Sequence, residues 1–225
     1  VILRAGSECL HSSQAIAECL HHGLKIAKLP VDCVQLVPTR ERAAVEEMLT
    51  MNGIIDVIIP RGGKSLTKLI QDESRVPTIL HLDGNCHTYI HKAADVNMAR
   101  DVLLNAKMRR VGICGATESL LIDADIAANI LPNLVDTLTK AGCKILGDAA
   151  AQKIDARIEQ ASEDDWCTEY LAAIISVKIV KDLEEAIAHI NHYGSHHTDS
   201  IITSDTSVAR KFLREVDSAI VMHNT

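Results

Sequence analysis

Residues 34–60 read VQLVPTRERAAVEEMLTMNGIIDVIIP, and this stretch decides the fold class. Val34–Val37 has the composition of a strand, Arg40–Met51 has helical spacing, and Ile54–Ile59 predicts a second strand that stops at Pro60. The second strand is apolar except for Asp56, a pattern typical of a parallel strand buried on both faces. Strand, helix and strand in this order predict an α/β protein with a parallel sheet.

The same alternation extends in both directions. On the N-terminal side, Val1–Arg4 predicts a short strand and Ser12–Lys28 predicts a helix. On the C-terminal side, Lys64–Gln71 predicts a helix and Thr78–Leu82 a strand. The apolar positions of the first helix are Ala15, Ile16, Cys19, Leu20 and Leu24. We therefore expect part of a doubly wound, Rossmann-like domain over residues 1–84.

After Gly84 the alternation of strands and helices starts again, and we expect a second α/β domain over residues 85–225. Strands are predicted at Cys86–His91, Ser119–Asp123, Lys144–Leu146, Ala172–Val180, Ser200–Thr203 and Ala219–Met222. Helices are predicted at Asp95–Met108, Ile126–Lys140, Leu183–Asn191 and Ser207–Val216. Asp95 is expected to cap its helix, and Gly142 to end the second one. Asp155–Asp165 is charged and only weakly periodic.

Composition narrows the classes of function. The chain has 225 residues, of which 47% are hydrophobic, and a formal net charge of -7, which argues against nucleic acid or an anionic membrane as the main partner. Apolar runs stay well short of the roughly 18 residues of a membrane span, and the N-terminus does not read as a signal peptide. We therefore expect a cytosolic or organelle-matrix protein, with the cytoplasm preferred.

Seven cysteines are spread along the chain and none forms a Cys-x-x-Cys pair. Their odd number and wide spacing favour reduced thiols over a disulfide framework or a zinc knuckle. The chain also carries eleven histidines, including the helical pair His189 and His192. Zinc sites need three or four closely spaced ligands, so we expect structural or surface roles for the histidines and no metal.

The heptapeptide Gly-Ile-Cys-Gly-Ala-Thr-Glu at 112–118 is the strongest candidate for chemistry. Its glycines permit a sharp turn and leave space beside the thiol of Cys114 for a substrate carbonyl. Arg109 and Arg110 precede the turn, and their positive charge favours a thiolate. The alternative is that Cys114 is one more small buried hydrophobe, which is the commoner role of cysteine.

Four blocks of sequence carry a family resemblance: VIIPRGGK at 57–64, GNCH at 84–87, NAK at 105–107 followed by GICGATE, and EDDWCTEY at 163–170. In these blocks the chain resembles the glutamate-5-semialdehyde dehydrogenases, also called gamma-glutamyl phosphate reductases. This family is the proline-biosynthesis branch of the aldehyde dehydrogenase superfamily. The similarity runs from Val1 to Thr225 but covers only the middle of the family's usual chain. We therefore expect further segments on both sides, including a C-terminal closing segment.

The resemblance implies a reaction. A thiolate at the position of Cys114 attacks gamma-glutamyl phosphate, phosphate leaves, and NADPH reduces the thioester to glutamate-5-semialdehyde. Hydrolytic aldehyde dehydrogenases carry a glutamate base before a glycine pair, and His81 is nearest to that place here. Family membership also implies a homo-oligomer, and a glutamate kinase as a partner or as a fused domain.

The resemblance also implies ligand contacts. Arg4 matches a basic residue near the adenosine ribose, where a cation suits the 2′-phosphate of NADPH. Glu169 matches a glutamate that contacts the nicotinamide ribose. The turn expected beside the cofactor consists of Arg61, Gly62, Gly63 and Lys64. The residues expected near the substrate are Asn85, His87 and His197.

Each of these positions has a plainer interpretation. Arg61 and Lys64 are equally explained as solvated turn residues, and Glu169 as a half-exposed residue with no ligand. Asn85 follows a glycine, which is ordinary turn chemistry. For the whole chain, the alternative is a non-catalytic member of the same fold that serves as an oligomerisation or regulatory subunit. A phosphate-independent aldehyde dehydrogenase is less favoured, because the glutamate base is missing before Gly84.

Overall fold

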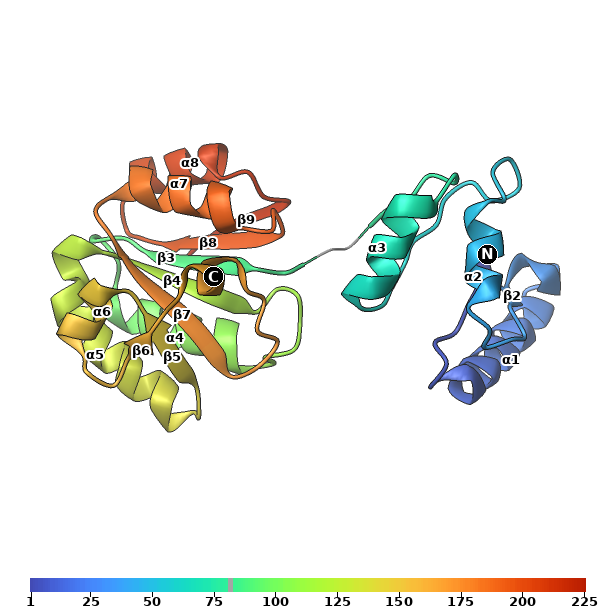
Figure 1. The fold of residues 1–225 in the computed structure, drawn as a ribbon, viewed down its shortest axis with the longest axis horizontal. Coiled ribbons are helices and arrows are strands. Elements are labelled where there is room, and N and C mark those ends of the chain that lie inside the picture. The colour runs from blue at the N-terminus through green and yellow to red at the C-terminus, as the bar shows by residue number, and fades with distance from the viewer. Residues whose placement is uncertain (81–82) are drawn as a thin grey trace. The chain divides into compact units, whose positions relative to one another are not determined.

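A computed structural model of the chain describes residues 1–80 and 83–225. The chain divides into two compact units, Val1–Leu82 and Asp83–Thr225. Each unit has its own helices and strands (Figure 1).

The second unit is built on a seven-stranded sheet in which every neighbouring pair of strands is parallel. Its strand order is β6-β5-β7-β4-β3-β8-β9. The strands are β3 (Cys86–Ile90), β4 (Thr117–Asp123), β5 (Lys144–Gly147), β6 (Glu159–Gln160), β7 (Ile174–Val180), β8 (Thr198–Ile202) and β9 (Ile220–His223). The strands β3 and β4 lie at the centre of the sheet and are buried along their whole length, polar residues included.

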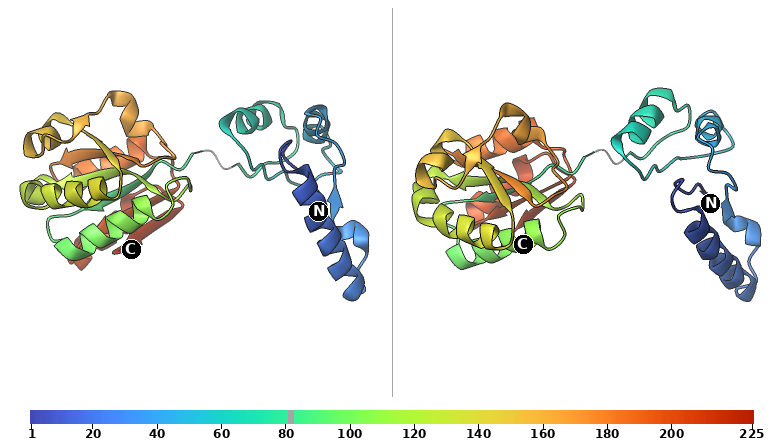
Figure 2. Two further views of the ribbon diagram at one scale, coloured as in Figure 1. Left: turned by 90° about the horizontal axis from the view of Figure 1, so that it is seen from below. Right: turned by 60° about the horizontal axis from the view of Figure 1, so that its bottom comes forward.

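Helices cover both faces of this sheet (Figure 2). One face carries α4 (Val96–Met108), α5 (Ala124–Lys140) and α6 (Ala149–Ile154). The other face carries α7 (Leu183–Tyr193) and α8 (Thr206–Glu215). The arrangement has three layers and belongs to the α/β class that the sequence predicts for this unit.

Two apolar cores lie on either side of the sheet, and alternate residues of β4 supply them. Leu120 and Ile122 pack with α4 and α5, whereas Leu121 packs with α7 and α8. This alternation follows from the two-residue period of a strand. Because both faces are covered, the ends of the strands are the places where a site can open to solvent.

Several predicted helix boundaries in the second unit are confirmed. The side chain of Asp95 accepts a hydrogen bond from the backbone nitrogen of Met98 at 2.8 Å and caps α4. Gly142 follows α5 with a φ of +84°, a conformation that glycine adopts without strain. The helix α6, which Asp148 caps, was not predicted, because six residues are too few to show a helical period.

The first unit contains β1 (Ile2–Leu3) and β2 (Gln35–Leu36), which pair in parallel. Its helices are α1 (Leu10–Ile26), the 3-10 helix η1 (Val31–Cys33), α2 (Ala43–Leu49) and α3 (Lys64–Glu73). A small apolar cluster between α2 and α3 contains the buried side chains of Val45, Leu49 and Ile70. The parallel strands and intervening helices belong to the predicted α/β class.

The prediction of a long buried strand at Ile54–Ile59 is wrong in this structure. Ile58 forms an isolated parallel bridge with Thr78, and Ile54 and Ile59 are 78% and 60% exposed. An apolar run becomes a buried strand only where other strands pair with both of its edges and helices cover its faces, and the described residues of this unit do not supply that cover. The predicted strand Thr78–Leu82 includes His81 and Leu82, which lie outside the described residues.

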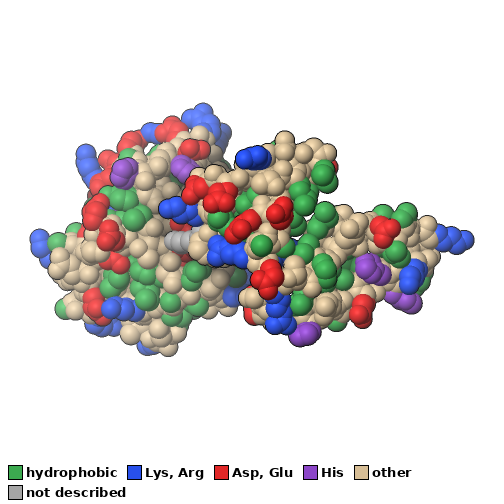
Figure 3. Space-filling model, turned by 45° about the vertical axis from the view of Figure 1, so that its right-hand side comes forward, with side chains coloured by type: hydrophobic (Ala, Val, Ile, Leu, Met, Phe, Trp, Pro, Cys, Tyr) green, Lys and Arg blue, Asp and Glu red, His purple; other side chains and the backbone are tan. Residues whose placement is uncertain are grey.

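The apolar face predicted for α1 is also largely on the surface, since Ile16 and Leu20 are exposed and only Ala17 is buried. Figure 3 shows hydrophobic side chains at the surface between acidic and basic ones. In residues 1–80 and 83–225, no helix has both the length and the apolar character needed to cross a membrane.

Candidate functional site

Cys114 lies on a turn between α4 and β4, at the amino end of the central strands. The thiol is half-buried, while Gly112, Ile113 and Gly115 around it are exposed. The turn that carries Cys114 therefore lies at the surface of the unit. Arg109 and Arg110, which precede the turn, are both exposed.

Gly84 packs directly against the backbone of Cys114. A Cβ atom at position 84 would lie 2.0 Å from the carbonyl oxygen of Cys114, far inside contact distance. Gly84 is itself buried, so the clash could not be relieved by turning outward. Only glycine is compatible with this approach of the two segments.

Glu169 joins the same contact. Its Oε1 accepts a hydrogen bond from the backbone nitrogen of Gly84 at 2.9 Å, and its side chain is half-buried. Through Gly84, the structure thus brings together Cys114 and Glu169, two residues that the sequence resemblance assigns to thiol chemistry and to cofactor binding.

Cys86, at the start of β3, is a second cysteine next to the turn. Its thiol donates a hydrogen bond to the carbonyl oxygen of Cys114 at 3.1 Å. Burial raises the pKa of the Cys86 thiol to about 12, and the carboxylate of Asp199 adds to the shift. Cys86 therefore stays protonated near neutral pH and acts as a hydrogen-bond donor rather than as a nucleophile.

Asn85 and His87 lie behind the turn in the interior. The side-chain nitrogen of Asn85 donates to the carbonyl oxygens of Trp166 and Tyr193 at 2.9 and 2.8 Å. The backbone nitrogen and Nδ1 of His87 lie 2.7 and 3.0 Å from Oδ1 of Asp199. Both residues have structural partners, and their predicted contact with substrate stays a prediction.

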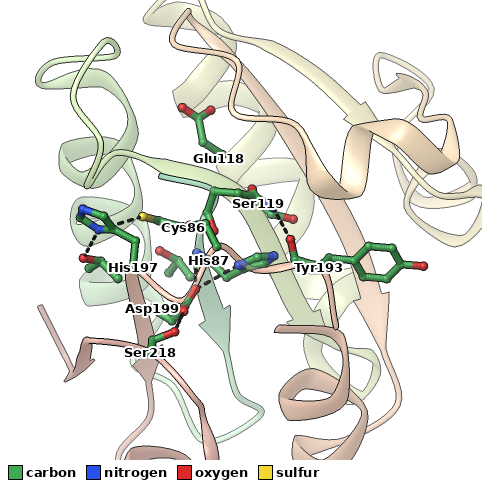
Figure 4. A network of polar contacts seen from close by, with 12 residues as sticks. Cys86, His87, Glu118, Ser119, Tyr193, His197, Asp199 and Ser218 are labelled. Carbon is green, nitrogen blue, oxygen red and sulfur yellow. Dashed lines mark hydrogen bonds and ion pairs between the residues drawn. The ribbon is translucent and has the colours of Figure 1, made fainter. Parts of the chain in front are cut away.

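Figure 4 shows this network, in which Asp199 lies between His87 and Ser218, with Cys86 and His197 close by. The hydroxyl of Ser218 donates to Oδ2 of Asp199. His197 is half-buried, and its Nδ1 lies 2.8 Å from Oγ1 of Thr198 and 3.9 Å from the sulfur of Cys86. His197 therefore approaches the Cys114 turn through Cys86, which lies between them.

The candidate residues of the second unit share one position in the fold. They precede or begin four neighbouring strands: Glu169 comes before β7, Cys114 before β4, Gly84 before β3, and His197 before β8. In a parallel sheet the amino ends of neighbouring strands meet at one edge. The sheet order, rather than the sequence order, therefore assembles the site.

The remaining predicted positions belong to the first unit. Nη2 of Arg4 donates to the carbonyl oxygen of Arg40 at 3.0 Å, while its buried Nε has no partner among the described residues. Arg61, Gly62 and Gly63 are exposed and come directly before α3, which starts at Lys64 and has no side-chain cap. An open helix N-terminus next to glycines is suited to an anion. His81, named as the counterpart of the hydrolytic glutamate, lies outside the described residues.

Two groups in the site were not predicted. Asp199 is far from His87 in sequence, and no local pattern links them. Lys107 and Glu118 form an ion pair with both side chains fully buried. Both residues stand in the blocks NAK and GICGATE that carry the family resemblance, but their burial and their pairing are visible only in the structure. In the described part of the chain, no group of three or more His, Cys, Asp or Glu side chains is arranged to hold a metal ion.

The geometry of a cysteine turn on a parallel α/β sheet agrees with the comparisons with known proteins. The model of the aldehyde dehydrogenase family matches residues 1–165. The chain belongs to the aldehyde dehydrogenase family.

Within the family, the chain is similar to gamma-glutamyl phosphate reductases, as its sequence blocks predict. It is 58% identical to the gamma-glutamyl phosphate reductase of Methylorubrum populi over 224 residues, which are 99% of this chain and 52% of that protein. The crystal structure of gamma-glutamyl phosphate reductase from Thermotoga maritima superimposes with a TM-score of 0.94 at 38% identity, over 100% of this chain and 54% of that one. The chain thus spans about half the length of the curated relatives it matches.

A more distant structure shares the fold. Glyceraldehyde-3-phosphate dehydrogenase from Methanocaldococcus jannaschii, complexed with NADP, has a TM-score of 0.77 at 17% identity, over 99% of this chain and 57% of that one.

The contact between Gly84 and Cys114 leads to a prediction. Gly84→Ala should lower the free energy of unfolding by about 1–3 kcal/mol or more, because the new methyl group must displace the backbone of Cys114. The matched control is Gly115→Ala, where a Cβ meets no atom within 4 Å. Denaturant unfolding of the full-length protein measures both. Equal unfolding midpoints for the two variants would contradict the contact.

A second prediction concerns His189 of α7, which packs against the rings of His87, Trp166 and Tyr193. Burial lowers the pKa of His189 from 6.5 to about 3, and the positive charges of His87, Lys178 and His192 add to the shift. Between these two pH values the unfolded chain binds the proton and the folded chain does not. The contribution of neutral His189 to the free energy of unfolding is therefore complete above pH 6.5, and it is lost as the pH falls toward 3.

Replacing this group should remove part of the pH dependence. His189→Phe is expected to flatten the rise of unfolding free energy over this range by at most about 1.4 kcal/mol per pH unit. Thermal unfolding at a series of pH values measures the slope. His192→Gln, an exposed position on the same helix, is the control. The assignment is wrong if both variants keep the slope of the parent protein.

Proposed function

We propose that the full-length protein containing this chain is an NADP-dependent reductase that converts gamma-glutamyl phosphate to glutamate-5-semialdehyde and phosphate, in the cytoplasm. The observation that carries the proposal is the contact of Gly84 with both the Cys114 backbone and the carboxylate of Glu169. The similarity to gamma-glutamyl phosphate reductases supports the choice of substrate.

In the proposed reaction, the thiolate of Cys114 attacks the carbonyl carbon of the acyl phosphate. A carbon–sulfur bond forms, the carbon–oxygen bond to phosphate breaks, and inorganic phosphate leaves with the electron pair. A thioester results, and it is easier to reduce than the ester that serine would give. When bound, the nicotinamide would supply the hydride for reduction of this thioester to the aldehyde, and the carbon–sulfur bond would break to return the thiolate of Cys114.

The chain's own residues fit such a cofactor. The buried Nε of Arg4, which has no partner among the described residues, and the open N-terminus of α3 after Gly62 and Gly63 are suited to phosphate groups. We propose Arg4, Arg61, Gly62, Gly63 and Lys64 of the first unit as cofactor contacts. Glu169 would accept hydrogen bonds from the nicotinamide ribose, and the NADP complex of the M. jannaschii enzyme supports a nicotinamide cofactor for this fold.

Substrate contacts are proposed for the residues at the start of β3 and β8. His197 is half-buried and next to Cys86, so it is the best placed of them. Asn85 and His87 lie deeper in the interior, and their hydrogen bonds would hold the start of β3 in place beside the substrate. Because an acyl phosphate is short-lived, we also propose a glutamate kinase as a partner or fused domain. Family membership further supports a homo-oligomeric enzyme.

The proposal predicts a phosphate-dependent reverse reaction. The full-length protein should turn over repeatedly with NADP⁺ and glutamate-5-semialdehyde only when phosphate is added, because phosphate must release the acyl group from Cys114 before the next cycle. Cys114→Ala should lose at least roughly 10³-fold in rate, since it removes the nucleophile. Absorbance of NADPH measures the rate. Cys167→Ser, at an exposed cysteine of the same unit, is the control and should keep the rate of the parent.

Each other outcome favours one of the alternatives. Turnover without phosphate would indicate a hydrolytic aldehyde dehydrogenase. Absence of turnover in a folded, full-length protein would favour a non-catalytic oligomerisation or regulatory subunit of the same fold.

A further inference from the structure

Lys107 and Glu118 form a fully buried ion pair next to the Cys114 turn. Lys107 lies in the last turn of α4, Glu118 is the second residue of β4, and both side chains are 0% exposed. Burying two charges costs several kcal/mol of desolvation, and apolar residues of the same size often replace such a pair without loss of stability. The pair therefore contributes little net stability, and its effect on the protein is to fix the geometry of the segments that carry it.

Glu118 occupies an irregular position of the sheet. Along β3 and β4, Cys86 is opposite Thr117 and His87 is opposite Ser119, so the register shifts at Glu118, which has no opposite residue on β3, as in a β-bulge. A bulge changes the direction of a side chain and bends its strand, and bulges are common next to active sites. Here the bulge comes directly after the Cys114 turn, and the carboxylate of Glu118 meets Lys107.

The second carboxylate oxygen of Glu118 reaches the segment that carries Glu169. Oε1 of Glu118 lies 3.4 Å from the backbone nitrogen of Leu171, and the ammonium group of Lys107 lies 5.9 Å from the ring centre of Tyr170. Leu171 has a φ of +52°, a conformation that is unusual for a branched side chain and needs support from its surroundings. The hydrogen bond from Leu171 supplies part of that support.

We propose that Lys107 and Glu118 are positioning residues that hold the Cys114 turn and the Glu169 segment in one fixed geometry, a role that rests on the proposed function. Lys107 precedes the turn, Glu118 follows it, and the same carboxylate binds the backbone two residues after Glu169. Neither residue contacts the reacting atoms. Their effect reaches the thiol through the ends of the turn, and it reaches Glu169 through the backbone of Leu171.

Two kinds of variant test this role in the full-length protein. Glu118→Gln removes the charge of one partner, and the double variant Lys107→Met with Glu118→Leu replaces the pair by apolar side chains of similar size. The double variant is expected to fold, because no unpaired charge is left inside. Leu134→Ala, in the core of α5, is the matched control for a loss of stability that leaves the pair intact.

The first readout is alkylation of Cys114 by iodoacetamide, followed by peptide mass spectrometry, with the exposed Cys19 and Cys33 as internal references. Release of the turn exposes the half-buried thiol, so alkylation of Cys114 should be several-fold faster in the double variant and in Glu118→Gln, but not in Leu134→Ala. The second readout is turnover. A misplaced thiol should lower kcat roughly 10- to 100-fold, and the KM for NADP⁺ should rise because Glu169 loses its support.

Faster alkylation combined with slower turnover, both absent from the destabilised control Leu134→Ala, would separate the positioning role from a general loss of stability. The proposal is overturned if Cys114 in the folded double variant is alkylated no faster than in Leu134→Ala. If the parent protein lacks reductase activity, the proposed function fails, but the alkylation comparison still decides whether the pair holds the turn.

Discussion

The approach of Gly84 to the backbone of Cys114 is the constraint on which the rest of the candidate site depends. A single additional carbon at position 84 would overlap the carbonyl group of Cys114. The same glycine donates its backbone nitrogen to Glu169. One residue without a side chain therefore brings the backbone of Cys114 and the carboxylate of Glu169 to the same point. Such a fixed approach favours a reaction that depends on the alignment of two bound reactants.

The position of the site follows from the sheet. In many open parallel α/β sheets, ligands lie beyond the carboxyl ends of the strands. Here the candidate residues precede the central strands β7, β4, β3 and β8 and gather at their amino ends. Both faces of the sheet are covered by helices, so the loops at this edge can vary while the layers beneath stay packed. The buried Lys107–Glu118 pair and the hydrogen bonds of Asp199 connect those loops to the layers.

Much of the second unit could be predicted from the sequence because its signals are local. The apolar run of β4, the cap at Asp95 and the glycines around Cys114 each act within a few residues. The partners of His87 and Glu118 could not be predicted, since Asp199 and Leu171 approach them only after the strands have paired. In the first unit, the apolar run at Ile54–Ile59 predicted burial that its described surroundings do not provide. An apolar run specifies what a strand can bury, whereas the neighbouring elements determine what it does bury.

The most direct measurement is to trap the acyl group on the protein. The full-length protein is mixed with glutamate-5-semialdehyde and NADP⁺ without phosphate, so that oxidation can occur but release by phosphate cannot. After acid quenching, peptide mass spectrometry should find a gamma-glutamyl thioester on the peptide that contains Cys114, and hydroxylamine should remove it. An adduct on a different cysteine, or none in a protein that turns over once phosphate is added, would contradict the assignment of Cys114 as the nucleophile.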